Sequence, residues 1–190
     1  TPTISVAPDN GGAPAVTNCA DGDAKTFCIA YAVPATTDAT QTVTISGAQD
    51  VALNTMVSNS AHTFEVDTVK PTVSAATVTP DPAKAGTVTA VVDFSETMSA
   101  TAPVLGFTGS PNLASNLDGS WTDTDTWTET FALADLNEAG TLTTLTVASA
   151  TDVAGNVMLA NNAADTFVVD TVDPTVTLVT VSPTQITDQN

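Results

Sequence analysis

An internal repeat with a spacing of 102–103 residues constrains the fold of this chain more than any other feature. The stretch from Phe64 to Val73 recurs from Phe167 to Val176, with the same Asp-Thr-Val and Pro-Thr-Val positions. Shorter matches keep the same spacing: residues 42–45 with 144–147, 50–54 with 152–156, and 77–80 with 180–183. Self-similarity of this kind indicates a chain built from copies of one structural unit.

The repeat length predicts a β-sandwich as that unit, because a sandwich domain takes about 100 residues. We expect residues 1–68 to form the C-terminal part of one domain, residues 69–171 a complete domain, and residues 172–190 the first strand of a following one. Asp-Thr-x-x-Pro segments at 67–71 and 170–174 are the expected joints, since proline fixes φ where the next strand begins. These ends favour a slice of a longer array, or ends that complement each other between chains.

Residue alternation supports an all-β chain. Two stretches of the complete repeat have an alternating pattern, which is typical of half-buried strands. The residues that share one face are Val88, Ala90, Val92 and Phe94 in the first stretch, and Trp127, Glu129, Phe131 and Leu133 in the second. Leu145, Val147, Phe167 and Val169 continue the predicted core, and Phe27, Ile29, Tyr31, Val43 and Ile45 form its counterpart in the first repeat. We expect residues 110–120 to be loop, with a turn at Asp118-Gly119, and a bulge near the out-of-phase Leu142.

The charge balance excludes several partners. The chain has 21 acidic residues against 3 basic ones, a formal net charge of -18. Nucleic acids and anionic membrane surfaces need Lys and Arg to neutralise phosphate, so neither is an expected partner. The absence of a long apolar run predicts no membrane insertion. At 42% hydrophobic residues the chain is too apolar for a disordered acidic tail, and its acids suit turns and metal cations.

Three segments carry a resemblance to a known family: Phe94-Ser95-Glu96, residues 152–156, and residues 167–174. They resemble the bacterial immunoglobulin-like repeats of giant surface adhesins and biofilm-associated proteins. The resemblance covers nearly the whole chain and implies tandem immunoglobulin-like sandwiches of Greek-key topology, with about seven strands each. It further implies an extender on the cell surface, with calcium at the joints between repeats. The first repeat departs from the pattern, because Leu53 replaces the turn glycine and Lys70 stands where the second joint has Asp173.

The second joint is therefore the best candidate calcium site. Calcium takes six to eight oxygen ligands, mostly carboxylate and carbonyl. Asp170 and Asp173 lie on the joint itself, and further ligands are expected from loops at the same end of the domain: Asp152, or Asp135, Asn137 and Glu138. Two other carboxylate pairs, Asp93 with Glu96 and Asp21 with Asp23, are weaker candidates. The alternative is that these aspartates only cap turns and solvate the surface.

Cys19 and Cys28 are the only cysteines, and they flank an Asp-Gly turn signal. In an extracellular protein this arrangement predicts a disulfide across a hairpin. A zinc site would need four Cys or His ligands, which the surroundings do not supply. The complete repeat has no cysteine, so the bridge is expected to be a local staple.

Trp121 and Trp127 are the residues that suggest a ligand. Exposed tryptophans can stack on sugar rings, and Asp123 and Asp125 lie beside them. Trp127 is in phase with Phe131 and is expected in the core, which leaves Trp121 for a sugar. The alternative is that both rings pack in the sandwich.

The sequence thus predicts a structural, extracellular, cell-surface protein and not an enzyme, since the single histidine, His62, has no nucleophile or acid in a catalytic spacing. Three functions remain open. The first is an extender or stalk segment of an adhesin. The second is a subunit of a self-assembling filament or S-layer, whose terminal strand completes a neighbouring subunit. The third is a carbohydrate-binding module. Neighbouring repeats are the expected partners, with glycans as a further alternative.

Overall fold

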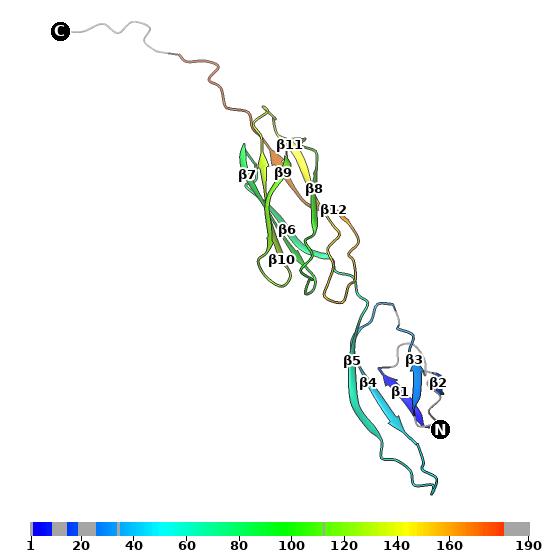
Figure 1. Ribbon diagram of the computed structural model, residues 1–190. Coiled ribbons are helices and arrows are strands. Elements are labelled where there is room, and N and C mark those ends of the chain that lie inside the picture. Colours follow the sequence, from blue (N-terminus) through cyan, green and yellow to red (C-terminus); the bar gives the residue numbers. More distant parts are fainter. Residues whose placement is uncertain (1, 9–14, 19–25, 34, 112, 181–190) are drawn as a thin grey trace, which may run out of the picture. The chain divides into compact units, whose positions relative to one another are not determined.

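A computed structural model describes residues 2–8, 15–18, 26–33, 35–111 and 113–180. Over these ranges the chain is all-β, which confirms the expected class (Figure 1). None of the described residues forms a helix that could cross a membrane. The strands are β1 (Thr3–Ala7), β2 (Ala15–Asn18), β3 (Phe27–Ala30), β4 (Asp38–Ser46), β5 (Asn59–Asp67), β6 (Val73–Thr79), β7 (Gly86–Phe94), β8 (Val104–Thr108), β9 (Leu113–Trp121), β10 (Thr126–Leu133), β11 (Thr141–Ala148) and β12 (Asn161–Val169).

The chain divides into two compact units. Unit 1 consists of Thr1–Pro71 together with Thr151–Leu159, and unit 2 consists of Thr72–Ala150 together with Ala160–Asn190. The 151–159 loop is thus grouped with the first repeat, although the sequence repeat places it in the second. This grouping matters for the functional site described below.

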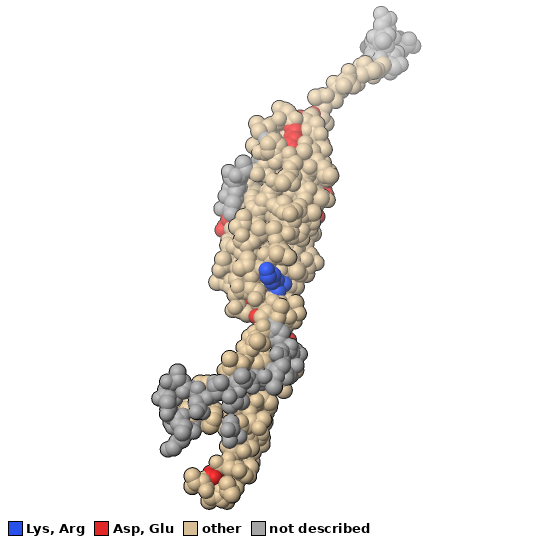
Figure 2. Space-filling view, turned by 90° about the vertical axis from the view of Figure 1, so that its right-hand side faces the viewer, with Lys and Arg blue, Asp and Glu red and all other residues tan. Residues whose placement is uncertain are grey.

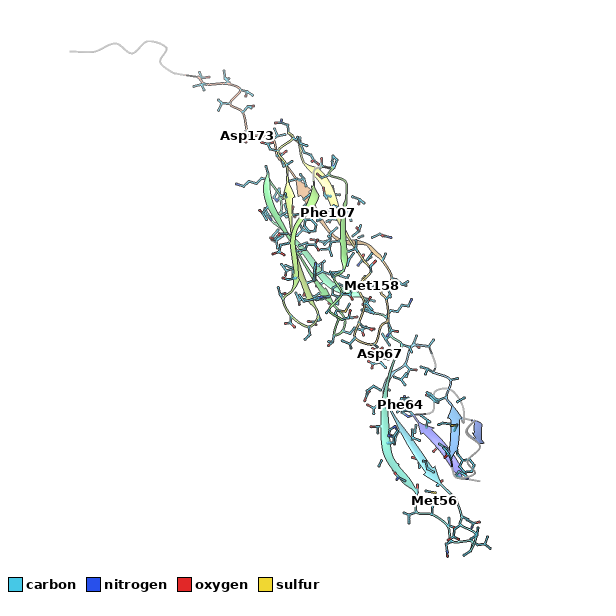
Figure 3. The ribbon with its side chains drawn as sticks, in the orientation of Figure 1. Met56, Phe64, Asp67, Phe107, Met158 and Asp173 are labelled. Carbon is cyan, nitrogen blue, oxygen red and sulfur yellow. The ribbon has the colours of Figure 1, made fainter. Side chains whose placement is uncertain are left out.

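Unit 2 contains two antiparallel sheets that share one apolar core. Their strand orders are β6-β7-β10-β9 and β12-β11-β8. The sheets meet at Phe107 of β8, whose ring lies edge-on to Phe131 of β10 at a centroid distance of 4.7 Å and to Phe167 of β12 at 5.8 Å (Figure 3). The predicted alternation is confirmed on both sheets, because the following residues are buried: Val88, Ala90, Val92, Phe94, Trp127, Phe131, Leu133, Leu145, Val147, Phe167 and Val169.

The predicted loop at 110–120 is wrong. Residues 113–121 form β9, an edge strand that pairs with β10 through two register shifts. Asn, Asp, Gly and Ser in this segment favour turns, but pairing with a well-buried neighbour outweighs that preference. Gly119 lies inside the strand and not in a turn, since it pairs with Glu129 of β10. Glycine is needed there because a Cβ would lie 2.6 Å from Cζ2 of Trp127. The expected bulge near Leu142 is also misplaced: Leu142 simply points outward, and the register shift in β11 falls between Leu145 and Val147.

Unit 1 repeats one of these sheets. Its strands β1-β4-β5 have the same order as β8-β11-β12 in unit 2, and they pair antiparallel. The hairpin β2-β3 is the second sheet of the unit, and among the described residues β3 pairs only with β2. Tyr31 packs edge-on against Phe64 at a centroid distance of 6.1 Å. An apolar hollow of about 220 Å³ remains between the sheets, lined by Pro2, Ile4, Phe27, Ile45 and Ala48.

Candidate functional site: the joints and the Asp-Asn loops

The two joints, residues 67–71 and 170–174, have the same local geometry. The carboxylate of Asp67 accepts a hydrogen bond from the Val69 amide at 2.9 Å, and that of Asp170 accepts one from the Val172 amide at 3.1 Å. The threonine that follows each aspartate bridges back to a loop of its own repeat. Thr68 exchanges hydrogen bonds with Thr37 at 2.7 Å each.

Thr171 does the same with Glu138 in unit 2. Its amide donates to the Glu138 carbonyl at 2.7 Å, and its hydroxyl accepts from the Glu138 amide at 2.8 Å. A side-chain hydroxyl that satisfies a loop amide holds the chain in a fixed direction as it leaves the sheet. The aspartate and threonine of the joint are therefore structural residues, and their repetition explains why the sequence match is strongest there.

A second repeated device is the pair of Asp-Asn loops, which we define as residues 50–56 and 152–158. Asp50 receives hydrogen bonds on one carboxylate oxygen from the amides of Ala52 and Asn54, at 2.8 and 2.9 Å, and on the other from the Asn54 side chain at 2.8 Å. Asp152 is held in the same way by the Asn156 amide and side chain, at 2.8 Å each. Each aspartate thus organises its own loop.

The main difference within the loops lies at the turn position. Leu53 adopts a positive φ of 67° where Gly155 has 96°. Only glycine adopts such angles without a steric cost, so the second loop has the better turn residue. An antiparallel bridge closes both loops, Gln49 with Thr55 and Thr151 with Val157. The two loops therefore share the bonds between the aspartate and the asparagine, but they differ in strain and in the second amide that the carboxylate accepts, Ala52 in one loop and Gly155 in the other.

The two loops differ in the burial of their aspartates, Asp152 and Asp50. In unit 1 the side chain of Asn156 donates a hydrogen bond to the Asp67 carbonyl at 3.2 Å, and carboxylate oxygens of Asp67 and Asp152 lie within 4.8 Å of each other. Asp152 is 1% exposed and Met158 is 5% exposed. In contrast, Asp50 is exposed, and hydrogen bonds from Asn54 and Ala52 hold its pKa below the ordinary value of an aspartate against a small opposing effect of burial.

The second joint borders a hollow. It has a volume of about 300 Å³ and is lined by Lys84, Ala85, Asp135, Asp170, Thr171, Val172, Asp173 and Pro174. Three of the predicted calcium ligands, Asp135, Asp170 and Asp173, therefore share this hollow. Lys84 adds a positive charge to the same lining, which offsets part of their negative potential.

The other predicted ligands have different surroundings. Glu138 bonds to the joint through Thr171 and accepts a hydrogen bond from the Ser110 hydroxyl at 2.7 Å, and Asn137 takes a positive φ of 56° in the same loop. Asp152 belongs to unit 1, where Asp67 is its neighbour. Calcium at the second joint stays a prediction, with Asp135, Asp170 and Asp173 as the carboxylates that share one hollow.

The predicted ligand residue Trp121 lies in an aromatic cluster of unit 2. Its ring packs at centroid distances of 5.2 Å from Trp127 and 5.7 Å from Phe94. Aromatic pairs at such distances stabilise a core beyond their buried area. Trp121 is only partly exposed. Carbohydrate binding stays an untested prediction.

A buried carboxylate lies beside this cluster. Glu129 is 3% exposed, and it accepts a hydrogen bond from the indole Nε1 of Trp127 at 2.7 Å. The predicted alternation places Glu129 on the same face as Trp127 and Phe131, and that face of β10 is buried. The hydrogen bond between Glu129 and the Trp127 indole was not predicted.

The predicted disulfide involves one residue that the structure describes and one that it does not. Cys28 lies on β3, whereas Cys19 lies outside the described residues, so their bridge stays a prediction.

On the face shown in Figure 2, acidic side chains are scattered singly. Compared with protein-family models, curated proteins and solved structures, the chain matches none. The function must therefore be argued from the two joints, the two loops and the sheets that hold them.

Proposed function

We propose that this chain is a structural repeat segment, an extender or stalk of an extracellular cell-surface adhesin built from immunoglobulin-like sandwiches. The observation that carries the proposal is the repetition of a complete connecting device. Both joints and both Asp-Asn loops recur with the same hydrogen bonds, although they have no catalytic side chain in common. Selection on chemistry would preserve one site, whereas a module that must be joined end to end needs the same connection each time.

The architecture suits a load carried along the chain. Each joint is short, begins with a hydrogen-bonded aspartate and ends in proline, so it resists bending more than a Gly/Ser linker would. In unit 2 the N-terminal region is also tied to the last strand: Ala83 donates to the Val168 carbonyl at 2.7 Å and accepts from the Asp170 amide at 2.9 Å. A force on the two ends of the repeat would have to break these bonds before the sheets separate.

Single-molecule stretching of the whole chain tests this proposal. We expect the complete repeat to resist force and then to unfold in one step of about 30–35 nm, the contour length of about 100 residues. A Phe167→Ala variant should unfold at a clearly lower force with the same step length. Extension without a discrete step, or with a step that does not correspond to one repeat, would contradict the proposal.

A second function, assembly into a filament by strand exchange, is favoured by two exposed apolar surfaces. The hollow of unit 1 lies between sheets whose counterparts in unit 2 are buried by β6 and β7. Residues 174–180 match the start of β6 in sequence, yet they are exposed: Val176 by 82%, Leu178 by 80% and Val179 by 76%. A strand of this sequence from another copy would bury both surfaces.

A peptide of residues 172–183 tests strand exchange. Added to a chain that lacks residues 172–190, it should bind and slow amide exchange in β1, β4 and β5, because it would cover the hollow lined by Ile4 and Ile45. A peptide of the same composition in scrambled order is the control. Equal exchange with both peptides would remove strand exchange and leave the extender proposal standing.

A further inference from the structure

We propose that the exposed Asp-Asn loop of unit 1, residues 50–56, binds the second joint, residues 170–174, of another copy of this chain. The contact would be head to tail. It deepens the proposed function and rests on it in one respect only, the treatment of the two repeats as equivalent modules.

The precedent is the loop 152–158, which already binds a joint of the same type. Its Asn156 side chain donates to the carbonyl of Asp67, and its Asp152 and Met158 are buried. Asp67 is the first residue of the first joint, and its counterpart in the second joint is Asp170. Unit 1 therefore contains one occupied example of the contact, with the donor and the acceptor identified.

The receptor is the hollow of about 300 Å³ at the second joint. Asp170, Thr171 and Val172 line it, and these residues have the same hydrogen bonds as Asp67, Thr68 and Val69. Because the backbone is held in the same way, the Asp170 carbonyl is equivalent to the Asp67 carbonyl that accepts from Asn156. The Asp170 carbonyl can therefore accept a hydrogen bond from the asparagine of an Asp-Asn loop, as the Asp67 carbonyl does.

The ligand is the loop 50–56, whose internal hydrogen bonds already match those of the bound loop. A preformed loop loses little conformational entropy on binding. Met56 is partly exposed, whereas its counterpart Met158 in the bound loop is 5% exposed, so Met56 presents apolar surface that a partner would bury. Figure 3 shows Met56 and Asp67 at opposite ends of unit 1, so the free loop lies away from the joint that is already occupied. Asn54 would donate to the Asp170 carbonyl as Asn156 does to that of Asp67.

The geometry predicts open-ended assembly. The loop is on unit 1 and the receptor is on unit 2, so the two surfaces differ and each copy offers one of each. Heterologous contacts of this kind extend into chains unless they close into a ring. Each copy has a net charge of -18, so repulsion opposes association at low ionic strength, and salt should strengthen it. Lys84 is the cation that lines the receptor.

Sedimentation of the full chain over a range of concentrations at raised ionic strength tests the proposal. We expect the wild type to self-associate. Asn54→Ala should weaken the association about tenfold, as expected for loss of a hydrogen bond with a buried acceptor. Met56→Asp, which leaves the hydrogen bonds of Asp50 with Ala52 and Asn54 intact, should have a similar effect. Asn162→Ala removes an exposed amide on β12 and is the matched control, with no expected change.

Two joint variants separate this contact from strand exchange. Val172 lines the receptor, so Val172→Asp should weaken head-to-tail association, whereas Val176→Asp should leave it unchanged. Mixing Met56→Asp with Val172→Asp should give a 1:1 pair and nothing larger, since each variant keeps one working surface. A wild-type chain that stays monomeric at the highest concentration, or a Met56→Asp chain that associates like wild type, would overturn the inference. The stretching experiment is unaffected by either result, so the extender proposal is judged separately.

Discussion

The same three-stranded sheet occurs in both units, but it is protected to different degrees. In unit 2 the sheet β12-β11-β8 faces a four-stranded partner, and Val147 on its central strand is 1% exposed. In unit 1 the sheet β1-β4-β5 faces only the β2-β3 hairpin among the described residues, and the equivalent Ile45 is 37% exposed. The aromatic residue of the last strand follows the same trend, since Phe167 is 1% exposed and Phe64 is only partly buried.

We infer from this difference that β6 and β7 supply much of the buried core of the repeat. These strands contribute Val78, Val88, Ala90 and Val92, all between 0 and 4% exposed. Among the described residues of unit 1 no strands correspond to β6 and β7. The sheet with the connecting devices is thus formed by local pairing in both units, whereas its burial comes from a segment more distant in the sequence.

The largest expected effect is at the two phenylalanines. Phe167→Ala should destabilise unit 2 by about 3–5 kcal/mol, the usual cost of removing a fully buried ring. Phe64→Ala should cost unit 1 only about 1–2 kcal/mol, because its ring is less buried. Both tryptophans lie in unit 2, so their fluorescence during urea unfolding reports that unit alone.

Amide exchange of β4 and β5 reports unit 1 in the same samples. The control is Leu142→Ala, which removes an exposed side chain from β11 and should leave both readings unchanged. Equal losses for Phe64→Ala and Phe167→Ala would show that unit 1 is as well packed as unit 2, and the comparison above would fail.

A smaller effect is expected at Gly119, where β9 crosses Trp127. An added methyl group would lie 2.6 Å from the indole ring and 3.2 Å from Glu129 Cγ, and both of these side chains are buried. Gly119→Ala should therefore destabilise unit 2 by about 1–3 kcal/mol through overpacking. Its neighbour Ser120 is exposed, so Ser120→Ala is the matched control. Unchanged tryptophan emission and unfolding midpoint in Gly119→Ala would mean that β9 does not pass so closely.

The two joints can be compared through calcium. If Asp135, Asp170 and Asp173 hold the ion, calorimetry should detect binding with a Kd of about 0.1–1 mM, the range of extracellular modules. Asp173→Lys gives the second joint the residue of the first, where Lys70 stands, and should weaken binding about tenfold or more, because a ligand is lost and a positive charge gained. Asp118→Lys, an exposed site on β9, controls for net charge. Binding that is the same in both variants would place the ion elsewhere.

The smallest effect is local and depends on pH. Because hydrogen bonds lower the folded-state pKa of Asp50 below its unfolded value of about 3.9, the ionised carboxylate stabilises the 50–56 loop above that pH. This stabilisation is lost as pH falls through the folded-state pKa. Carbon and amide NMR shifts of Asp50 and Asn54 should therefore titrate together at acid pH. In Asp50→Asn the Asn54 amide should lose this transition; a transition that persists would assign it to another group.

Much of the fold follows from the sequence, because strands that are buried on one face leave an alternating pattern. Val88 to Phe94 and Trp127 to Leu133 were predicted on the correct face for this reason. Residues 113–121 were not, since an edge strand of turn-forming residues owes its structure to pairing with β10 and not to its own preferences. Glu129 was also placed on the correct face, but its hydrogen bond with the Trp127 indole was not predicted, because alternation does not identify the partner of a buried carboxylate.

The candidate site was predicted in part. The sequence repeat identified the joints and the Asp-Asn loops as segments, and loop proximity indicated that Asp135 belongs with Asp170 and Asp173. It did not show that Asp152 binds next to Asp67, because that contact joins segments 85 residues apart and depends on packing. Nor could it show that, in two loops with nearly the same sequence, Asp152 is buried and Asp50 is exposed.

Amide hydrogen exchange of the two Asp-Asn loops in a dilute sample compares their protection directly. In both loops the aspartate accepts hydrogen bonds from the asparagine amide and side chain, but only Asn156 also donates to a joint, and only Asp152 is buried. We predict that the amides of Gly155 and Asn156 exchange at least about tenfold more slowly than those of Ala52 and Asn54, after correction for intrinsic rates. Equal protection of the two loops would contradict the claim that they are copies of one connecting device, of which one is occupied and one is free.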